Sequence, residues 1–253
     1  MSVSAAHDGV YVYAVLRAAT ALPKDGTGVG SPPAVLRSIS QGPLAAVVSD
    51  APPQLRARRR DLLAHQNLLM RLADEGPVLP MRFGMVAADE QSVLAQLAAE
   101  ESAYAATLDR LAGRIEINIK VLPAQNALEA LVAEDKSVQK LRAAARRSPG
   151  YEASVRLGEA ISGALTRRAA AAGQRILREL ASTARAAVPG PEVPGCVLNQ
   201  SFLVDRAESE AFLLQAQSLG ASFREHAEIR PAGPLPCYSF VSAEARSVLV
   251  GGK

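Results

Sequence analysis

The most informative stretch of the sequence is Val78-Leu79-Pro80-Met81-Arg82-Phe83-Gly84-Met85-Val86, which follows the turn signal Glu75-Gly76-Pro77. With the two-residue period of a β-strand, one face of this stretch is apolar along its length. Its members are Leu79, Met81, Phe83 and Met85. The other face carries a proline, a glycine and the charge of Arg82, which an interior strand would avoid because proline donates no hydrogen bond. We therefore predict a strand at a sheet edge or a bulge, with Arg82 in an ion pair to Asp61 or to Glu75.

The composition is that of a protein with a full hydrophobic core and no extreme of charge. Of the 253 residues, 49% are hydrophobic and 4% are aromatic, and the formal net charge is +3. A chain of this length forms one large or two ordinary domains. Because the chain has no Trp, its core must be built mainly from Ala, Leu, Val and Ile, which favours closely packed helices.

The sequence predicts neither a metal site nor a cofactor. Its cysteines, Cys196 and Cys237, form no CxxC motif and no Cys/His cluster, so we predict no zinc site and reduced thiols. The glycines of residues 22–33 are not followed by the Lys-Ser/Thr pair of a phosphate-binding loop. The N-terminus lacks the pattern of a signal peptide, and no apolar run is long enough to span a membrane. We therefore expect a soluble, cytoplasmic protein without a membrane partner.

The first half of the chain alternates strands with two long helices. The apolar and β-branched runs are short and are separated by turn signals, such as Gln41-Gly42-Pro43. Asp89 is expected to cap the second helix. We expect strands over residues 10–16, 35–40 and 44–49, and helices over residues 53–74 and 89–113.

His65 lies on the apolar stripe of the first helix, between Leu62 and Leu69. A lone histidine on such a stripe is typical of a hydrogen-bonded core residue, and we interpret it so. The enzyme alternative would combine His65 as a general base with Arg82 and an acid such as Asp61 or Glu75. Because no nucleophile or metal set accompanies them, we predict that the protein is not an enzyme.

The second half begins with the clearest strand of the chain, residues 115–121, in which apolar and polar residues alternate. Ile117 and Ile119 lie on its apolar face, so we expect a half-buried strand. Arg167, Arg175 and Arg178 lie on the outside of the longest of the following helices. We expect helices over residues 125–134, 138–147, 151–187 and 206–219, strands over residues 196–204, 221–230 and 237–241, and a turn at 231–234.

This order of elements predicts an α+β protein of two domains. The first is an N-terminal mixed α/β domain, and the second is a C-terminal modified ferredoxin-like domain with a long helical hairpin, residues 125–187, inserted into it. The limits that we predict are residues 1–113 and 114–245, with residues 246–253 as a flexible tail.

Three motifs follow one another along the chain. They are Tyr11-Val12-Tyr13-Ala14-Val15; Arg59-Arg60-Asp61 with the stretch at 78–84; and Gly233-Pro234-Leu235-Pro236-Cys237-Tyr238-Ser239-Phe240-Val241. Together they resemble the GvpF/GvpL family of gas vesicle proteins, over about residues 10–245. The chain departs from the family pattern at residues 115–121, which lack the usual aromatic near Ile117, and at Cys237, where the family often has Pro.

The resemblance implies an accessory protein of gas vesicle assembly in a prokaryote. It implies as partners the small hydrophobic shell protein and other accessory gas vesicle proteins, and a fold of two α+β domains. Before assembly, an apolar shell subunit needs a partner that covers its strand edges and apolar surface. We expect the long helix pair, with Arg167, Arg175 and Arg178, and the sheet face at residues 115–121 to form the docking surface.

A basic cluster at the start of the first long helix leaves a second interpretation open. Its members are Arg56, Arg58, Arg59 and Arg60. Basic residues are unfavourable at a helix N-terminus, so ion pairs with nearby acidic residues are one explanation. The alternative is a nucleic-acid or small-anion binding module that uses the Arg-rich helices. An RNA-binding sheet of ferredoxin-like type needs exposed aromatics, which residues 115–121 lack, so we predict no nucleic-acid partner.

Overall fold

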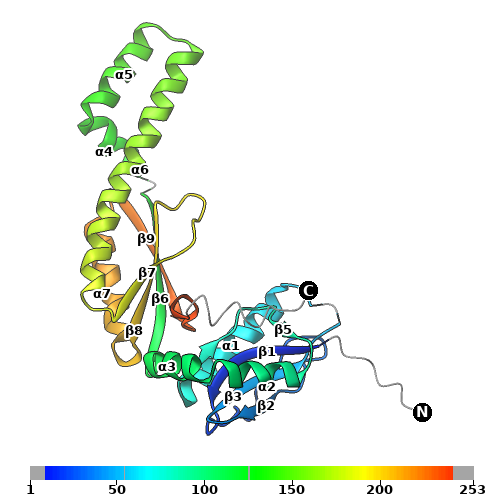
Figure 1. The fold of residues 1–253 in the computed structure, drawn as a ribbon. Coiled ribbons are helices and arrows are strands. Elements are labelled where there is room, and N and C mark those ends of the chain that lie inside the picture. The colour runs from blue at the N-terminus through cyan, green and yellow to red at the C-terminus, as the bar shows by residue number, and fades with distance from the viewer. Residues whose placement is uncertain (1–8, 54, 125, 242–253) are drawn as a thin grey trace. The chain divides into compact units, whose positions relative to one another are not determined.

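The computed structural model describes residues 9–53, 55–124 and 126–241 of the chain (Figure 1). Its fold is α+β, as predicted, with two sheets and, within these ranges, seven α-helices. The chain folds into two compact units. Among the described residues, unit 1 comprises residues 9–116 and 234–241, and unit 2 comprises residues 117–233. The domain limits 1–113 and 114–245 remain predictions.

The sheet of unit 1 is built around β1 (Val10–Arg17), which is buried along nearly its whole length, as its β-branched and aromatic residues predict. The other strands are β2 (Arg37–Gln41), β3 (Leu44–Asp50), β4 (Leu79–Pro80) and β5 (Val86–Ala87). Their order is β2-β3-β1-β4, and β5 also pairs with β1. The predicted hairpin is confirmed, because β2 and β3 pair antiparallel across a turn at Gly42.

Helix α1 (Arg59–Glu75) packs on the sheet face that carries Tyr11 and Tyr13. It begins six residues later than the predicted helix start at residue 53. The basic residues at 56–60 oppose the positive end of the helix dipole, which works against an earlier start. The predicted stripe is wrong at Leu62, which is 41% exposed. The residues that α1 buries are Asp61, His65, Leu68, Leu69 and Leu72.

Helices α2 (Glu90–Ala99) and α3 (Glu101–Leu111) replace the single helix predicted for residues 89–113. Asp89 caps α2 as expected, because its side chain accepts a hydrogen bond from Ser92 N at 2.7 Å. The large apolar residues that α2 and α3 bury are Val93, Leu97, Tyr104, Leu108 and Leu111.

The stretch at residues 78–86 is not the continuous strand that the sequence predicts. β4 and β5 both pair with β1, and residues 81–85 form a loop between them that keeps backbone hydrogen bonds to β1 only at its ends, through Met81 N and Met85 O. Pro80 donates no hydrogen bond, and Gly84 has a φ of 90°, in the left-handed region that favours glycine. Both faces are covered only at residues 78–81, whereas Arg82 and Gly84 are exposed on the face that was expected to be polar. The buried residues are Val78, Leu79, Pro80 and Met81.

The sheet of unit 2 has the strand order β7-β8-β6-β9, which is that of the predicted ferredoxin-like fold. Its strands are β6 (Arg114–Pro123), β7 (Ala186–Pro189), β8 (Leu198–Asp205) and β9 (Ala227–Leu235). Helix α7 (Ser209–Ser222) packs on this sheet, and the ring of Phe212 lies 5.3 Å from that of Phe202 in β8. The predicted strand at 115–121 is confirmed as β6, an interior strand between β8 and β9.

Three helices are inserted between β6 and β7: α4 (Ala127–Glu134), α5 (Lys136–Arg147) and α6 (Tyr151–Ala181). With 31 residues, α6 is about 46 Å long, and it is shorter than the helix predicted for residues 151–187. Its two halves bury different sides. The first half packs on α4 and α5 through Ala164, and in the second half Gly173 approaches Val121 and Leu198 of the sheet.

The predictions fail at the end of β9. This strand runs through residues 231–234, where we expected a turn, and residues 237–241 form no strand. Instead they contain a 3-10 helix, Tyr238–Phe240. Edge strands tolerate proline, so the prolines at residues 231–234 are compatible with a strand as well as with the predicted turn.

Residues 237–241 are held within unit 1 by side-chain hydrogen bonds. Ser239 donates to the Glu116 carboxylate from its N at 2.8 Å and from its Oγ at 2.7 Å. Arg110 donates to Phe240 O at 2.7 Å. Cys237 is buried and its Sγ donates to Arg114 O at 3.7 Å, whereas Cys196 is half-buried. The predicted tail at 246–253 lies outside the described residues.

Candidate interaction surfaces

His65 is the centre of a buried hydrogen-bond network in unit 1. It is 1% exposed, and its Nε2 lies 2.9 Å from Met81 O while its Nδ1 lies 3.0 Å from the Tyr11 hydroxyl. Because a carbonyl only accepts, Nε2 carries the proton and Nδ1 accepts from Tyr11. The Tyr11 oxygen in turn accepts from Gly84 N at 3.1 Å. The network therefore ties α1 and β1 to the loop at residues 81–85.

Tyr13 extends the network to the loop before β2. Its hydroxyl accepts from Val29 N at 2.8 Å and lies 2.9 Å from Ser49 Oγ. Since Ser49 donates to Asp50 O at 3.1 Å, the Tyr13 hydroxyl donates to Ser49. The rings of Tyr13 and His65 stack with their centroids 5.6 Å apart. Every polar group named here has a partner inside unit 1.

Burial decides the ionisation of this network. It lowers the pKa of His65 below its ordinary value and raises the pKa of Tyr11 and of Tyr13. At neutral pH, His65 is therefore uncharged and both tyrosines keep their protons. With both ring nitrogens engaged and the ring shut off from solvent, His65 has the geometry of a hydrogen-bonded core residue. Arg82 is exposed, so the structure does not join the two residues in one cleft.

The ion pair predicted for Arg82 is wrong. Asp61 instead accepts from Gly30 N at 3.0 Å and lies 3.3 Å from the Arg60 guanidinium. Arg82 has no ion pair within the described parts of the chain, to Glu75 or to any other carboxylate.

Arg82→Ala is therefore expected to leave the free energy of unfolding unchanged to within about 0.5 kcal/mol. Thermal unfolding of the variant measures this, next to Arg60→Ala, which removes the cation beside the buried Asp61 carboxylate. A loss in Arg82→Ala as large as that in Arg60→Ala would contradict the expectation.

The three arginines singled out on α6 lie on one exposed side of the helix. Arg167 and Arg178 are about three turns apart and leave the helix in nearly the same direction, with Arg175 between them. None of the three forms an ion pair with a described residue. The opposite side of this half faces the sheet. Its buried members are Ala169, Ala172, Gly173, Ile176, Leu177 and Leu180.

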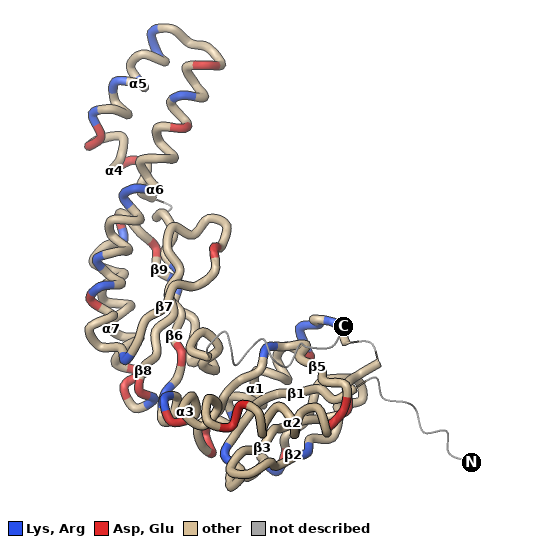
Figure 2. The backbone as a smooth tube through the Cα atoms, viewed as in Figure 1, with Lys and Arg blue, Asp and Glu red and all other residues tan. Residues whose placement is uncertain are grey.

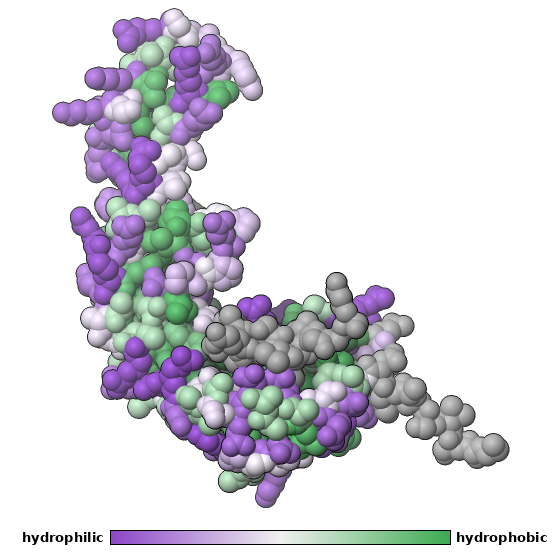
Figure 3. Space-filling model, in the orientation of Figure 1, coloured by the Kyte–Doolittle hydropathy of each residue, from purple (hydrophilic) through white to green (hydrophobic). Residues whose placement is uncertain are grey.

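The pair formed by α5 and α6 adds further cations and exposed apolar side chains. Lys136, Lys140 and Arg147 line the side of α5 opposite the buried Val138, and α5 contains no acidic residue (Figure 2). The buried cluster between the helices is thin and consists of Leu131, Val138 and Ala164. Figure 3 shows green side chains between the helices and purple ones outside. The large apolar residues that stay exposed here are Leu128, Tyr151 and Val155.

Ile117 and Ile119 do not belong to an exposed surface. Both are 0% exposed and lie in the interior strand β6, so a partner does not reach these two side chains, and docking on the sheet face at residues 115–121 stays a prediction. The edge strands of the sheet are β7 and β9. Pro189 ends the first and Pro231 lies within the second, and prolines on edges discourage the addition of another strand.

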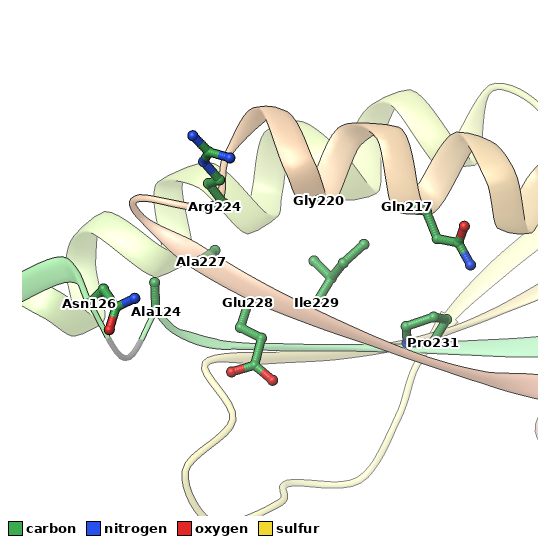
Figure 4. A pocket seen from close by; sticks show the side chains of 9 residues that line it. All are labelled: Ala124, Asn126, Gln217, Gly220, Arg224, Ala227, Glu228, Ile229 and Pro231. Atoms are coloured by element: carbon green, nitrogen blue, oxygen red, sulfur yellow. The ribbon is translucent and has the colours of Figure 1, made fainter.

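A pocket of 440 Å³ lies between the end of α7, β9 and the segment after β6 (Figure 4). Gly220 borders it, and a Cβ there would lie 2.6 Å from the Ile229 side chain, so a larger residue would not fit. Arg224 and Glu228 point to opposite sides of the strand β9 (Figure 4). Because its charged groups do not converge, this pocket lacks the arrangement of a catalytic site.

Sequence reasoning missed the partners of His65 and this pocket. A tyrosine buried in a strand normally needs a hydrogen-bond partner. The presence of Tyr11 and Tyr13 in the first strand therefore indicates that buried polar partners exist, though not which ones. The pocket depends on the approach of α7 to β9, which no local pattern encodes. Among the described residues, no helix is both long and apolar enough to cross a bilayer, and no three His, Cys, Asp or Glu side chains gather as metal ligands would.

Known proteins resemble this chain over nearly its whole length. The family model described as gas vesicle synthesis protein GvpL/GvpF matches residues 9–242. Gas vesicle protein F of Streptomyces sp. (strain CB03234) is 39% identical, with 91% of this chain and 98% of the relative covered. Gas vesicle protein L of the same strain is 31% identical, with 94% of each chain covered.

Two crystal structures of gas vesicle protein GvpF have the same fold. The structure from Anabaena sp. PCC7120 has a TM-score of 0.73 at 23% identity and covers 93% of this chain and 98% of its own. The structure from Microcystis aeruginosa has a TM-score of 0.71 at 20% identity and covers 93% and 99%. At such identities these structures support the fold alone. The family model and the Streptomyces relatives go further, and the chain belongs to the GvpL/GvpF family of gas vesicle synthesis proteins.

Proposed function

We propose that this protein supports gas vesicle assembly by binding the small hydrophobic shell protein, together with other accessory gas vesicle proteins. Membership of the family implies a role in gas vesicle formation. The binding partners and a cytoplasmic location at the vesicle are the proposal. Separation of floating vesicles from the supernatant, followed by detection of the protein in each, tests the location.

The observation that carries the proposal is the exposed surface of α5 and α6. It combines cations that form no ion pair with a described residue, among them Arg167, Arg175 and Arg178, with apolar side chains that the thin helix pair leaves in solvent. A partner for a hydrophobic shell subunit needs apolar area to shield it and charge to orient it. With prolines on both edges of the unit 2 sheet, docking on helices is favoured over addition of a strand.

Reversal of charge at Arg167, Arg175 and Arg178 to Glu is expected to weaken retention of the shell protein by about tenfold, because rim charges steer association and fix its register. The measurement is a pull-down from cells that co-express the shell protein with the tagged protein. The matched control reverses Lys24, Arg82 and Arg224, which are also exposed and change the net charge equally. Equal retention by both triple variants would contradict the proposed surface.

The alternative function for the same cations is nucleic-acid binding. One further experiment distinguishes it from binding of the shell protein. A duplex or single-stranded probe is titrated against the wild type and the α6 variant at low and at physiological salt. Probe binding that is lost in the variant, while the shell protein is retained as before, would replace shell-protein docking with nucleic-acid binding.

A further inference from the structure

A groove of 610 Å³ runs along the outer side of α1 in unit 1, on a surface that the proposed function does not use. One wall is the loop at Gly26 and Thr27. The other is a face of α1 over residues 60–71, about 16 Å or three helical turns long. Its apolar lining from α1 consists of Leu63, Ala64, Leu68 and Met70.

The loop wall is held in place on both sides of the groove. Arg71 donates to Asp25 O at 3.0 Å, and Asp61 accepts from Gly30 N at 3.0 Å. Val29 N, between them, donates to the buried Tyr13 hydroxyl. The groove is therefore preformed, which lowers the entropy that binding must offset.

The groove lining includes a large apolar side chain that is exposed to solvent. In the described part of unit 1, the large hydrophobic residues that stay exposed are Val35 at 83%, Leu62 at 41% and Leu63 at 45%. Leu62 and Leu63 are in the first turns of α1. Val35 directly follows Ala34, whose carbonyl accepts from Gly28 N in the loop wall. Of the three, Leu63 lines the groove itself.

The charged side chains that line the groove are basic, although Arg60 among them pairs with the buried Asp61 and the exposed Asp25 directly precedes the loop wall. Its charged lining residues are Arg60 and Arg71, with no carboxylate among them. Arg56, Arg58 and Arg59 precede or begin α1, are exposed and have no ion pair with a described residue. These charges oppose the dipole at the α1 N-terminus, a cost that nearby negative charge would offset.

From apolar lining, positive rim and length together, we propose that this groove docks an amphipathic helix of a partner protein, with its apolar face against Leu63 and its carboxylates toward Arg59 and Arg71. A helix of about three turns fills such a groove through side chains at i, i+3, i+4 and i+7. Its acidic flanks set the specificity, since a basic helix with the same apolar face meets like charge.

The test uses the full chain and a labelled synthetic peptide of about 18 residues, five helical turns, with Leu on one face and Glu on the flanks. Fluorescence anisotropy at physiological salt is expected to show saturable binding that Leu63→Ser and Arg59→Glu each weaken by about tenfold. Leu214→Ser and Arg224→Glu are the matched controls, because both residues are exposed in unit 2. Both are expected to bind as the wild type does.

A second peptide, with Lys in place of Glu, is expected not to bind. Three results would each overturn the proposal. They are no binding of the acidic peptide, binding of the basic peptide as tight as that of the acidic one, and a loss of affinity in the unit 2 controls as large as in the groove variants. Circular dichroism of every variant verifies folding, and the exposed positions keep that risk small. Retention of the shell protein by the same variants is measured separately, so failure here and failure of the α6 surface are distinguishable.

Discussion

His65→Leu is expected to lower the free energy of unfolding by about 3 kcal/mol, because it leaves two buried polar groups without partners at about 1–3 kcal/mol each. Met81 O loses its donor and the Tyr11 hydroxyl loses its acceptor. Leucine is apolar and close in size, so little packing energy is lost with the ring. Urea denaturation followed by circular dichroism measures the difference. Gln66→Leu, one residue further along α1, is the matched control and is expected to stay within about 0.5 kcal/mol of the wild type.

The pH dependence of stability gives an independent test of the same residue. Burial lowers the pKa of His65 in the folded state below its ordinary value of 6.5. At pH values between the folded and the unfolded pKa, the unfolded chain binds more protons than the folded protein does. The contribution of His65 to the free energy of unfolding is therefore fully present above pH 6.5 and decreases as the pH falls below it. The slope is at most about 1.4 kcal/mol per pH unit. His65→Leu should lack this part of the slope, and a variant with the full slope would contradict the assignment to His65.

The elements that the sequence predicts correctly are those whose pattern is local. The apolar run at residues 10–16, the alternation at 115–121 and the turn at Gln41-Gly42-Pro43 each correspond to an observed strand or hairpin. Asp89 could be assigned as a cap because its hydrogen bond spans only three residues. The periodicity of a segment indicates which of its side chains are buried. In these segments a single strand or hairpin buries all of them.

Prediction fails where distant residues decide. Alternation at residues 78–86 indicates one strand, but the loop at 81–85 is held by Tyr11 and His65, whose bonds to it no local pattern reveals. Residues 237–241 are held by Glu116 and Arg110, more than a hundred positions earlier in the chain. The proline-rich residues 231–234 indicate a turn by composition, although proline is also tolerated on the edge strand that they form.

For the candidate surfaces, the sequence predicts charge better than exposure. The spacing of the three arginines places them on one side of any α-helix, so their common side on α6 follows from the sequence alone. Ile117 and Ile119 were assigned a contact role from alternation, which cannot tell an interior strand from an edge strand. The groove beside α1 depends on how Arg71 and Asp61 fasten the loop, and that is a tertiary contact.

Gly173→Leu is expected to destabilise the protein by about 3 kcal/mol, at the upper end of the cost of overpacking a core. A Cβ at this position would lie 2.8 Å from Val121 Cγ1 and 2.9 Å from Leu198 Cδ1, closer than carbon atoms approach without displacement. The rest of the leucine would have to push α6 away from β6 and β8. That movement would open the core of unit 2 where Val121 is 0% exposed. The gain in helix propensity, up to about 1 kcal/mol, is too small to compensate.

Gly158 in the same helix provides the matched control, because an added Cβ there meets nothing within 4 Å. Gly158→Leu gains the propensity without the clash and should raise the free energy of unfolding by up to about 1 kcal/mol. Chemical denaturation of both variants should thus show shifts of opposite sign. Equal shifts would contradict the predicted clash at 173, whereas opposite shifts would mean that the close approach of α6 to the sheet requires glycine there. In the second case the position of the α6 arginines on the outer side of unit 2 rests on Gly173.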